Sequence, residues 1–266
     1  MPYTYIKRQI KKWLYGSCPG FRGTLPYFGS KVYFPKNSLI FQMVCDQGIY
    51  ESNILSAISA LIRPDTAYFD IGANIGLLSI PILQLHPSCN VVSFEPSPNA
   101  LPYLRRTAND SGFGERWQIV GKAVGSSEGE ADFFIAKSEL SAFDSIKNTN
   151  RAGYTQKTKV QLTTIDAEWN RMGRPKVSVI KIDVEGAEIL VMNGAEKCIS
   201  SERPCLLIEW NNLNLSAYDC RPETLLSFAQ HIEYKVLSLP NFILVDSPME
   251  LKLHMIKTEN FLLLPK

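Results

Sequence analysis

Two periodicities of apolar positions follow one another along the chain. Segments with an apolar residue every three or four positions are typical of helices with one buried face. They lie at 51–62, 77–85, 98–111, 185–199 and 222–231. Short runs that are mainly apolar, as strands buried on both faces are, lie at 67–71, 90–95, 117–124, 177–184, 205–210, 234–239 and 260–264. Helices that alternate with such strands predict an α/β fold with a mostly parallel sheet.

Two parts of the chain depart from this alternation. Segments 130–136 and 158–165 alternate between apolar and polar positions, which predicts a hairpin or extension around a polar stretch. Residues 16–45 are rich in glycine, proline and aromatic side chains, which favours loops and short strands over an independent domain. We therefore expect an N-terminal extension over 1–45 and a single α/β domain over 46–266.

The N-terminal segment combines basic and apolar side chains. Ile6, Ile10, Trp13 and Leu14 would share one face of a short helix. Such a helix can make a weak contact with a membrane surface or a partner, but we favour packing against its own domain. We predict neither a membrane-spanning helix nor a signal peptide, since no apolar run has the required length.

The composition narrows the class of protein further. Of 266 residues, 45% are apolar and 20% charged, which suits a globular fold and excludes a largely disordered chain. With 28 basic and 26 acidic residues the net charge is +2, too close to neutral to make nucleic acid the expected partner. The six cysteines form no C-x-x-C pair and the three histidines are scattered. We therefore expect reduced thiols in a cytoplasmic protein, and neither a zinc site nor a disulfide framework.

The strongest chemical signal is the turn after the first buried strand, Asp70-Ile71-Gly72-Ala73-Asn74-Ile75-Gly76. In a parallel sheet the ligand lies beyond the carboxyl ends of the strands, where glycines let the backbone approach it. The next helix offers free N–H groups. Glu95 ends the following strand, where an acid accepts hydrogen bonds from the ribose hydroxyls of an adenosine cofactor. Nicotinamide dinucleotides and S-adenosylmethionine (SAM) both fit this arrangement.

Two details favour SAM. The glycines are spaced G-x-x-x-G, which does not match the dinucleotide pattern G-x-G-x-x-G. Asp70 would repel a pyrophosphate but attract the ammonium group of the methionine moiety of SAM. One alternative is an NAD-dependent oxidoreductase. Another is a non-catalytic binding protein, in which Asp70 and Glu95 only cap the loop and the next helix.

A second group of acids follows the later strands. Asp183 and Glu185 share one side of an extended chain at the end of the fourth main strand, and Glu209 ends the next strand. Carboxylates there can orient an acceptor hydroxyl, take its proton or hold a divalent cation, so we predict catalytic roles for them. Mg²⁺ at Asp183 and Glu209 is a less favoured version, and we predict no metal. Alternatively, Glu185 and Glu188 favour a helix start through its dipole, and Glu209 is an exposed strand-end acid.

These residues resemble the FkbM-type methyltransferase family. The matching pieces, in family order, are Gly48-Ile49-Tyr50-Glu51, the turn at 70–76, Phe94-Glu95-Pro96, Ala123-Val124-Gly125, Thr164-Ile165-Asp166, Ile180-Lys181-Ile182-Asp183-Val184-Glu185-Gly186-Ala187-Glu188 and the strand ending at Glu209. The resemblance implies a Rossmann-like class I methyltransferase fold with seven strands, of which the last runs antiparallel.

The resemblance also implies a reaction and roles for residues. The reaction is SAM-dependent O-methylation of a sugar, a glycan, a lipid-linked acceptor or a secondary metabolite. Residues expected at SAM are Glu51 at the methionine end, Asp70, Gly72, Asn74 and Gly76 in the turn, Glu95 at the ribose and Ala123 at the adenine. Asp183 is expected near the transferred methyl group, and residues 137–157 are expected to shape the acceptor site.

Overall fold

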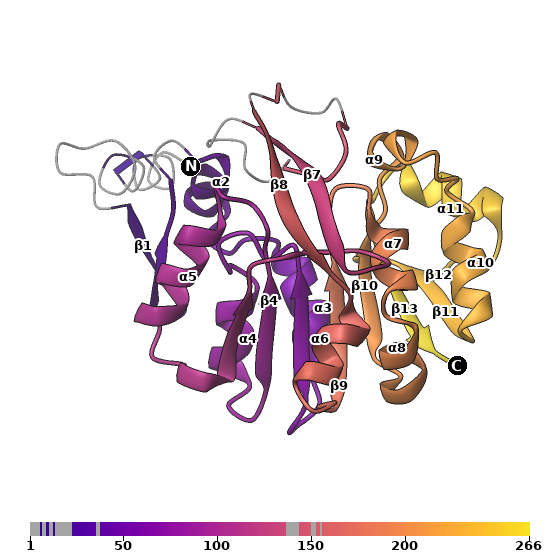
Figure 1. The fold of residues 1–266 in the computed structure, drawn as a ribbon, viewed down its shortest axis with the longest axis horizontal. Coiled ribbons are helices and arrows are strands. Elements are labelled where there is room, and N and C mark those ends of the chain that lie inside the picture. The colour runs from indigo at the N-terminus through magenta and orange to yellow at the C-terminus, as the bar shows by residue number, and fades with distance from the viewer. Residues whose placement is uncertain are drawn as a thin grey trace.

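The computed structural model describes residues 23–35, 38–136, 144–149, 153–154 and 156–266, together with Ile6, Gln9, Ile10 and Trp13. Figure 1 shows a large central sheet with helices on both sides. The strands of this sheet are β3 (Ala67–Ile71), β4 (Asn90–Phe94), β5 (Trp117–Val120), β9 (Val177–Ile182), β10 (Cys205–Glu209), β11 (Tyr234–Ser238), β12 (Ile243–Leu244) and β13 (Asn260–Pro265).

The described strands of the central sheet follow the order β12-β11-β13-β10-β9-β3-β4-β5. Neighbours from β5 to β10 pair in parallel, whereas β13 runs antiparallel between β10 and β11. The prediction of a mostly parallel sheet whose last strand is antiparallel is therefore confirmed. The seven expected strands are joined by an eighth, the two-residue β12, which pairs antiparallel with β11 at the edge.

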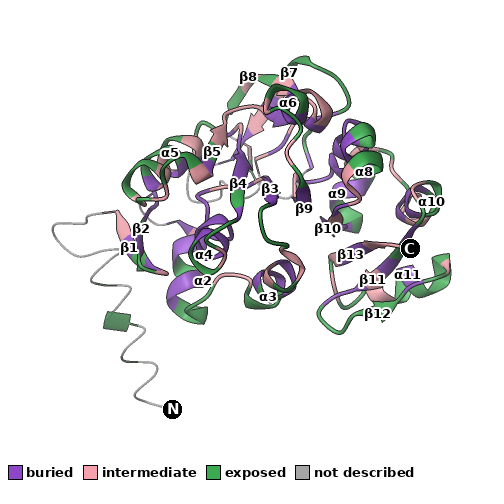
Figure 2. Cartoon of the chain, turned by 90° about the horizontal axis from the view of Figure 1, so that it is seen from below, coloured by how far each residue is buried: buried purple, intermediate pink, exposed green. Residues whose placement is uncertain are grey.

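Helices cover both faces of this sheet. They are α2 (Leu39–Gln47), α3 (Ser52–Leu61), α4 (Ser79–Leu85), α5 (Leu101–Asp110), α6 (Ile165–Arg171), α7 (Glu188–Asn193), α8 (Glu196–Glu202), α9 (Asn212–Ala217), α10 (Thr224–His231) and α11 (Pro248–Met255). Figure 2 shows α3 and α4 on one face and α6 and α8 on the other. Because side chains alternate along a strand, Tyr68 packs into the core on the first face and Phe69 into the core on the second.

Two smaller sheets accompany the central one. β1 (Thr24–Tyr27) and β2 (Ser30–Tyr33) form an antiparallel hairpin that packs on α5, where the Tyr33 amide donates to Thr107 Oγ1 at 3.0 Å. β6 (Ala123–Val124), β7 (Gly129–Ile135) and β8 (Gln156–Thr163) form a three-stranded sheet in the order β6-β8-β7. In Figure 1, β7 and β8 project beyond the end of the central sheet. The predicted hairpin at 130–136 and 158–165 corresponds to these two strands.

The segment predicted as one strand at 117–124 is two strands in different sheets. β5 pairs with β4, and β6 pairs with β8 after the chain passes Gly121 and Lys122. An apolar run cannot show where a chain leaves one sheet for another, because each of the two strands contributes apolar residues to the run.

The segment predicted as one helix at 185–199 is a loop followed by two helices, α7 and α8. The loop precedes α7 because Glu185 and Gly186 have φ of 57° and 106°, outside the helical region. Gly194 separates the helices at a close approach, since a Cβ there would lie 2.1 Å from the carbonyl oxygen of Gly125.

Two helices begin where loop or strand was predicted. β8 ends at Thr163, and Thr164 then caps α6 by accepting a hydrogen bond from the Ala167 amide at 3.0 Å. Residues 39–45 lie in α2 rather than in loops, with Ser38 as the N-cap. The prediction of short strands between residues 16 and 45 is correct for β1 and β2.

The described side chains of the N-terminal apolar face are exposed. Ile6, Ile10 and Trp13 expose 55%, 50% and 58% of their surface, which contradicts the expected packing against the domain. Leu14 lies outside the described residues. Within the part of the chain that the structure describes, none of the helices has the length and apolar character needed to cross a membrane.

Candidate active site

A cavity of about 220 Å³ opens at the carboxyl ends of β3, β4, β9 and β10, the edge of the sheet where the sequence predicts the site. Every predicted site residue except Gly76 lines this cavity. These residues are Glu51, Asp70, Gly72, Asn74, Glu95, Ala123, Asp183, Glu185 and Glu209. The roles assigned to them stay predictions.

The turn after β3 is held against both neighbouring strands. The amides of Gly72 and Ala73 donate to the carbonyl oxygen of Phe94, each at 3.0 Å. Gly72 has φ of +82°, and a Cβ on it would lie 1.8 Å from the carbonyl oxygen of Asp183. Glycine is therefore required both by the conformation and by the close approach of the backbone after β9.

Asn74 and Gly76 differ in what they contact. Asn74 lines the cavity, and its Oδ1 is buried without a hydrogen-bond partner among the described residues, so it offers an acceptor to a ligand. Gly76 has φ of +87°, and a Cβ there would lie 2.7 Å from the ring of Trp117. Gly76 thus serves the packing of the turn against β5, and it does not reach the cavity where the sequence predicts a cofactor contact.

Asp70 is buried and also faces the cavity. Its Oδ2 accepts a hydrogen bond from Ser79 Oγ at 2.6 Å, which ties the end of β3 to the first residue of α4. Burial raises the pKa of Asp70, and the positive charge of Lys181 opposes this rise. Asp70 therefore supports the loop and presents a carboxylate to the ligand site.

Glu95 bonds the two loops around it. Its Oε2 accepts from the Asn74 amide and its Oε1 from the Ser97 amide, each at 2.8 Å. Burial raises the pKa of Glu95 to about 7, against the effect of these two bonds. Because each carboxylate oxygen has a second lone pair, the bonds to the loops leave acceptor capacity for two hydroxyl groups.

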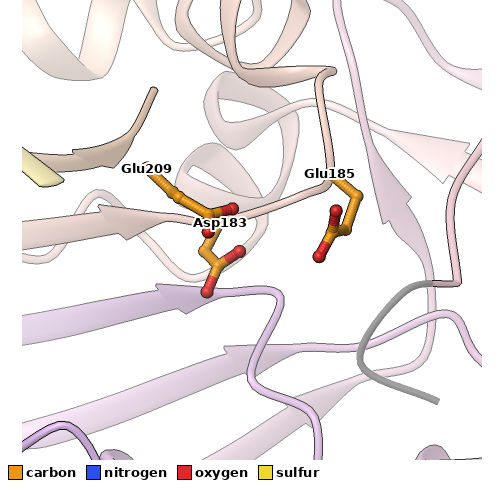
Figure 3. Close-up of side chains that lie close together, drawn as sticks. All are labelled: Asp183, Glu185 and Glu209. Atoms are coloured by element: carbon orange, nitrogen blue, oxygen red, sulfur yellow. The ribbon is translucent and has the colours of Figure 1, made fainter. Parts of the chain in front are cut away.

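Figure 3 shows the three carboxylates that the sequence assigns to catalysis, and we call them the carboxylate trio. One oxygen from each of Asp183, Glu185 and Glu209 lies within 4.8 Å of the others. Burial raises the pKa of Glu209 well above its ordinary value, and the neighbouring charges of Asp183 and Glu185 raise it further. Glu209 therefore holds its proton more tightly than an exposed glutamate does.

The loop after β9 directs Glu185 and Glu188 differently. Glu185 lines the cavity, and the Asn214 side chain donates to its Oε2 at 2.9 Å. Glu188 does not line the cavity, and its Oε1 accepts from the Gly186 amide at 2.9 Å. Burial raises the pKa of Glu188 to about 7. Glu188 thus stabilises the loop, as its position at the start of a helix indicates.

Lys181 is a site residue to which the sequence reasoning assigned no role. It is 5% exposed in the buried strand β9, and its Nζ lies 2.9 Å from Asp183 Oδ2. Burial opposes the charged form, but the carboxylates of Asp183, Asp70 and Glu51 raise the pKa of Lys181. The sequence could have indicated this role, because a lysine inside a strand that is otherwise mainly apolar needs an acidic partner.

Glu51 enters the cavity from the start of α3, where it has φ of 45°. Burial raises its pKa to about 7; the positive charge of Lys181 opposes this, and the negative charge of Asp183 adds to it. Glu51, Asp70 and Asp183 therefore share one buried ammonium, that of Lys181.

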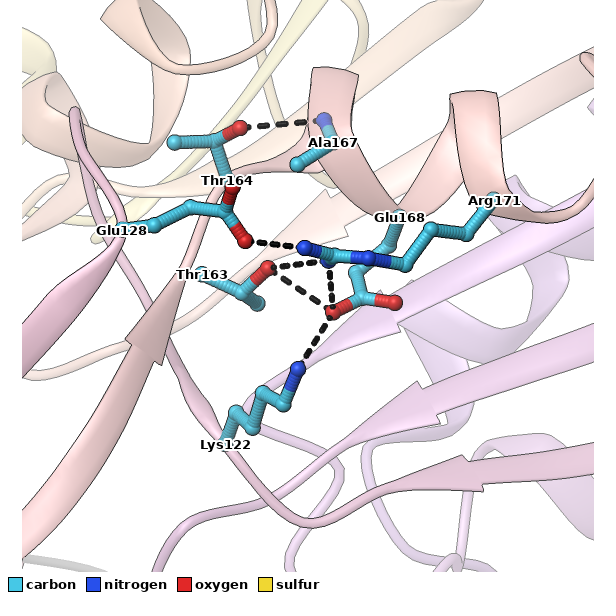
Figure 4. Close-up of polar contacts among 7 residues, drawn as sticks. All are labelled: Lys122, Glu128, Thr163, Thr164, Ala167, Glu168 and Arg171. Carbon is cyan, nitrogen blue, oxygen red and sulfur yellow. Dashed lines mark hydrogen bonds and ion pairs between the residues drawn. The ribbon is translucent and has the colours of Figure 1, made fainter.

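Lys122 lies at the opposite end of the cavity, beside Ala123. Figure 4 shows its Nζ against Glu168 Oε1 at 3.1 Å, and the same oxygen accepts from Thr163 at 2.8 Å and from Arg171 at 2.7 Å. Burial opposes ionisation, but these partners hold the pKa of Glu168 below its ordinary value. The network fixes the link between β5 and β6, and with it the position of Ala123.

The residues present fit an adenosine cosubstrate with a cationic end. The close backbone turn at Gly72, the open acceptor at Asn74 and the carboxylates of Asp70 and Glu95 line one continuous cavity. The carboxylate trio offers the ligand types that a divalent cation takes, but Asp183 already has the ammonium of Lys181 as its cation. The trio therefore has an internal counter-charge.

Comparisons with known proteins agree with this geometry. The family model described as the methyltransferase FkbM domain matches residues 70–234. The 2-O-methyltransferase NoeI of Sinorhizobium fredii is 26% identical over 162 residues, which cover 55% of this chain and 64% of NoeI. The AMB antimetabolite synthetase AmbE of Pseudomonas aeruginosa is 33% identical over 88 residues, which cover 33% of this chain and 4% of AmbE.

Among solved structures, a methyltransferase FkbM from Methylobacillus flagellatus aligns with a TM-score of 0.47 at 18% identity. The alignment covers 84% of this chain and 51% of that one. The chain thus spans under two thirds of NoeI and about half of the solved FkbM protein. Because the family model matches more than half of its residues, the chain belongs to the FkbM methyltransferase domain family.

Proposed function

We propose that the protein transfers a methyl group from SAM to a hydroxyl group of its acceptor. The observation that carries this proposal is the single cavity in which the cradle of Asp70, Asn74 and Glu95 meets the carboxylate trio. Membership in a methyltransferase domain family supports it.

Different residues of the cavity bind different parts of SAM. We assign Asp70 and Glu51 to the cationic methionine end, since both are carboxyl groups on the side of the cavity nearest Lys181. We assign Glu95 to the ribose hydroxyls and the segment at Ala123, held by Lys122 and Glu168, to the adenine. SAM, when bound, supplies an electrophilic methyl group, and all other steps belong to the chain.

The carboxylate trio handles the acceptor proton. The ammonium of Lys181 lies 2.9 Å from Asp183 and orients its carboxyl group, while burial raises the pKa of the neighbouring Glu209. Asp183 accepts the proton of the acceptor hydroxyl as its oxygen forms the new C–O bond and the C–S bond breaks. The main contribution of the cavity is to hold the oxygen in line with the methyl group.

The charge of the cavity points to the class of acceptor. Among the described residues, seven with carboxyl groups and two lysines line it, so a phosphorylated or otherwise anionic acceptor would be repelled. A neutral polyhydroxylated acceptor, such as a sugar, a glycan or a glycosylated small molecule, suits the trio because carboxylates accept hydrogen bonds from several hydroxyls. That NoeI is a 2-O-methyltransferase supports the choice of oxygen as the nucleophile.

Calorimetry with S-adenosylhomocysteine tests the proposal. We expect the wild type to bind it in the micromolar range, and Asp70→Asn and Glu95→Gln to weaken binding at least tenfold, about 1.4 kcal/mol each. Glu196→Gln, which alters an exposed acid in the first turn of α8, is the matched control and should bind normally. Transfer of a labelled methyl group to a panel of neutral glycosides should then depend on Asp183.

Three outcomes would contradict the proposal. If the folded wild type binds no S-adenosylhomocysteine, SAM is not its cosubstrate. If it binds NADH instead, the oxidoreductase alternative replaces the proposal. Binding without turnover of any hydroxyl acceptor favours a non-catalytic binding protein.

A metal-dependent version of the reaction has its own test. We predict that EDTA leaves turnover unchanged, because the ammonium of Lys181 already compensates Asp183. Loss of turnover with EDTA and its recovery with Mg²⁺ would assign the carboxylate trio to a cation.

A further inference from the structure

Residues 144–147, which we call the strap, lie beside β7 and border the cavity. Asp144, Ser145 and Ile146 line the cavity together with Pro96 and Ala123. The strap also pairs with β7, since the amides and carbonyls of Phe134 and Ser145 bond reciprocally at 2.8 and 3.2 Å. Polar sequence alone gave no reason to single out any residue in this stretch.

The first end of the strap is fastened beside the ribose position. Asp144 Oδ1 accepts from the Ala136 amide at 2.7 Å, and its Oδ2 accepts a short hydrogen bond from Ser97 Oγ. Ser97 also donates its amide to Glu95 Oε1 at 2.8 Å. One serine therefore joins the strap to the acid that we assign to the ribose hydroxyls.

The other end is fastened beside the carboxylate trio. The ammonium of Lys147 lies 4.8 Å from the centre of the Tyr218 ring, which is within the range of a cation–π contact. Tyr218 packs against Gly186, where a Cβ would lie 2.7 Å from the ring. The strap thus runs from the cosubstrate end of the cavity to the loop that carries Glu185.

We propose that Asp144 is a positioning residue for the cosubstrate: by fastening the strap to Ser97 and Ala136, it closes the cavity over the adenosine moiety. This inference rests on the proposed function, because it takes SAM as the occupant. Asp144 acts through the strap and through Ser97, and it takes no part in the transfer of the methyl group.

Dissociation of S-adenosylhomocysteine, measured by stopped-flow tryptophan fluorescence, tests this role. We expect Asp144→Ala to speed dissociation and to raise the KM for SAM about tenfold each, with kcat changed less than twofold, since the hydrogen bonds from Ser97 and from the Ala136 amide are both lost. Asp144→Asn keeps an oxygen acceptor and should recover part of the loss. Lys147→Met, at the other fastening, should also speed dissociation.

A double-mutant cycle separates the effect of the contact between Ser97 and Asp144 from the effect of general destabilisation. Ser97→Ala and Asp144→Ala break the same contact, so the double variant should dissociate no faster than the Asp144 single variant. Asp132→Asn removes an exposed charge from β7 and is the control that should match the wild type.

Two results would overturn the assignment while the proposed function stands. One is an unchanged dissociation rate in Asp144→Ala. The other is a joint fall of kcat and melting temperature with KM unaltered, which would make Asp144 a structural residue only. If the wild type itself binds no S-adenosylhomocysteine, the proposed function fails and this assignment fails with it.

Discussion

At the residue scale, the acids after β9 divide between loop structure and chemistry. Asp183 and Glu185 face the cavity, whereas Glu188 turns back to the amides of its own loop. Glu185 and Gly186, which lie between Asp183 and Glu188, have φ of 57° and 106°, outside the helical and strand regions. Two glutamates three positions apart, Glu185 and Glu188, therefore make different contacts.

Glu188 makes stability depend on pH. Its pKa is about 7 in the folded protein, against 4.5 ordinarily, so the folded state binds the proton more tightly than the unfolded chain does. The contribution of protonated Glu188 to the unfolding free energy is complete below pH 4.5 and is lost as the pH rises to 7. Between pH 5 and 7.5 we expect the unfolding free energy of the wild type to fall, relative to Glu188→Gln, by about 1–3 kcal/mol.

Urea unfolding at both pH values measures this difference. Glu188→Gln retains an oxygen for the Gly186 amide, so its loop bond persists. The exposed control Glu196→Gln should keep the slope of the wild type. Parallel pH curves for the wild type and Glu188→Gln would refute the prediction.

At the scale of elements, the site depends on two loops that interlock at the ends of β3 and β9. The turn at Gly72 touches the backbone of Asp183, and the Asp183 amide donates to the carbonyl oxygen of Ile71 at 3.1 Å. The turn after β3 and the loop that carries Asp183 are therefore positioned against each other by backbone, not by flexible side chains.

Two glycines with nearly the same positive φ test this contact. Gly72 and Gly48 have φ of +82° and +83°, but only Gly72 has another backbone against its Cβ position. We expect Gly48→Ala to cost about 1–3 kcal/mol from the positive φ alone. Gly72→Ala should cost at least about 3 kcal/mol and abolish binding of S-adenosylhomocysteine.

Chemical denaturation and calorimetry on both variants measure these effects. Equal stability losses in the two variants would show that the contact between Gly72 and Asp183 does not matter.

At the scale of the whole molecule, the last strand joins the two cores. β13 is inserted between β10 and β11, and its alternate side chains reach opposite faces of the sheet. Leu263 belongs to the core that contains α6 and α8, and Leu262 to the core that contains α3 and α4. The end of the described chain therefore holds both layers against the sheet.

We expect Leu262→Ala and Leu263→Ala each to lower the free energy of the same unfolding transition by about 2–5 kcal/mol, because both side chains are fully buried. Leu264, which is only partly buried, should cost less when changed to alanine. Calorimetry and circular dichroism should report one coincident transition for all three variants. Separate transitions for the two faces would contradict a single cooperative unit.

The amino-acid sequence by itself determined the α/β class, seven of the eight described strands of the central sheet and the edge at which the cavity opens. It could do so because buried strands are mainly apolar, and because acids such as Asp70 and Glu95 stand near the ends of those runs. The sequence also predicted the carboxylate trio, since Asp183 follows one strand and Glu209 ends the neighbouring strand.

Only the tertiary structure decided how elements divide and which distant groups meet. The break between β5 and β6, the capped helix α6 and the left-handed loop before α7 depend on pairing and close approach, which leave no period in the sequence. The contact of Asp144 with Ser97 joins residues 47 positions apart, and Lys181 shares its charge with acids from three segments. Local patterns record burial, but contacts between distant segments exist only once the chain has folded.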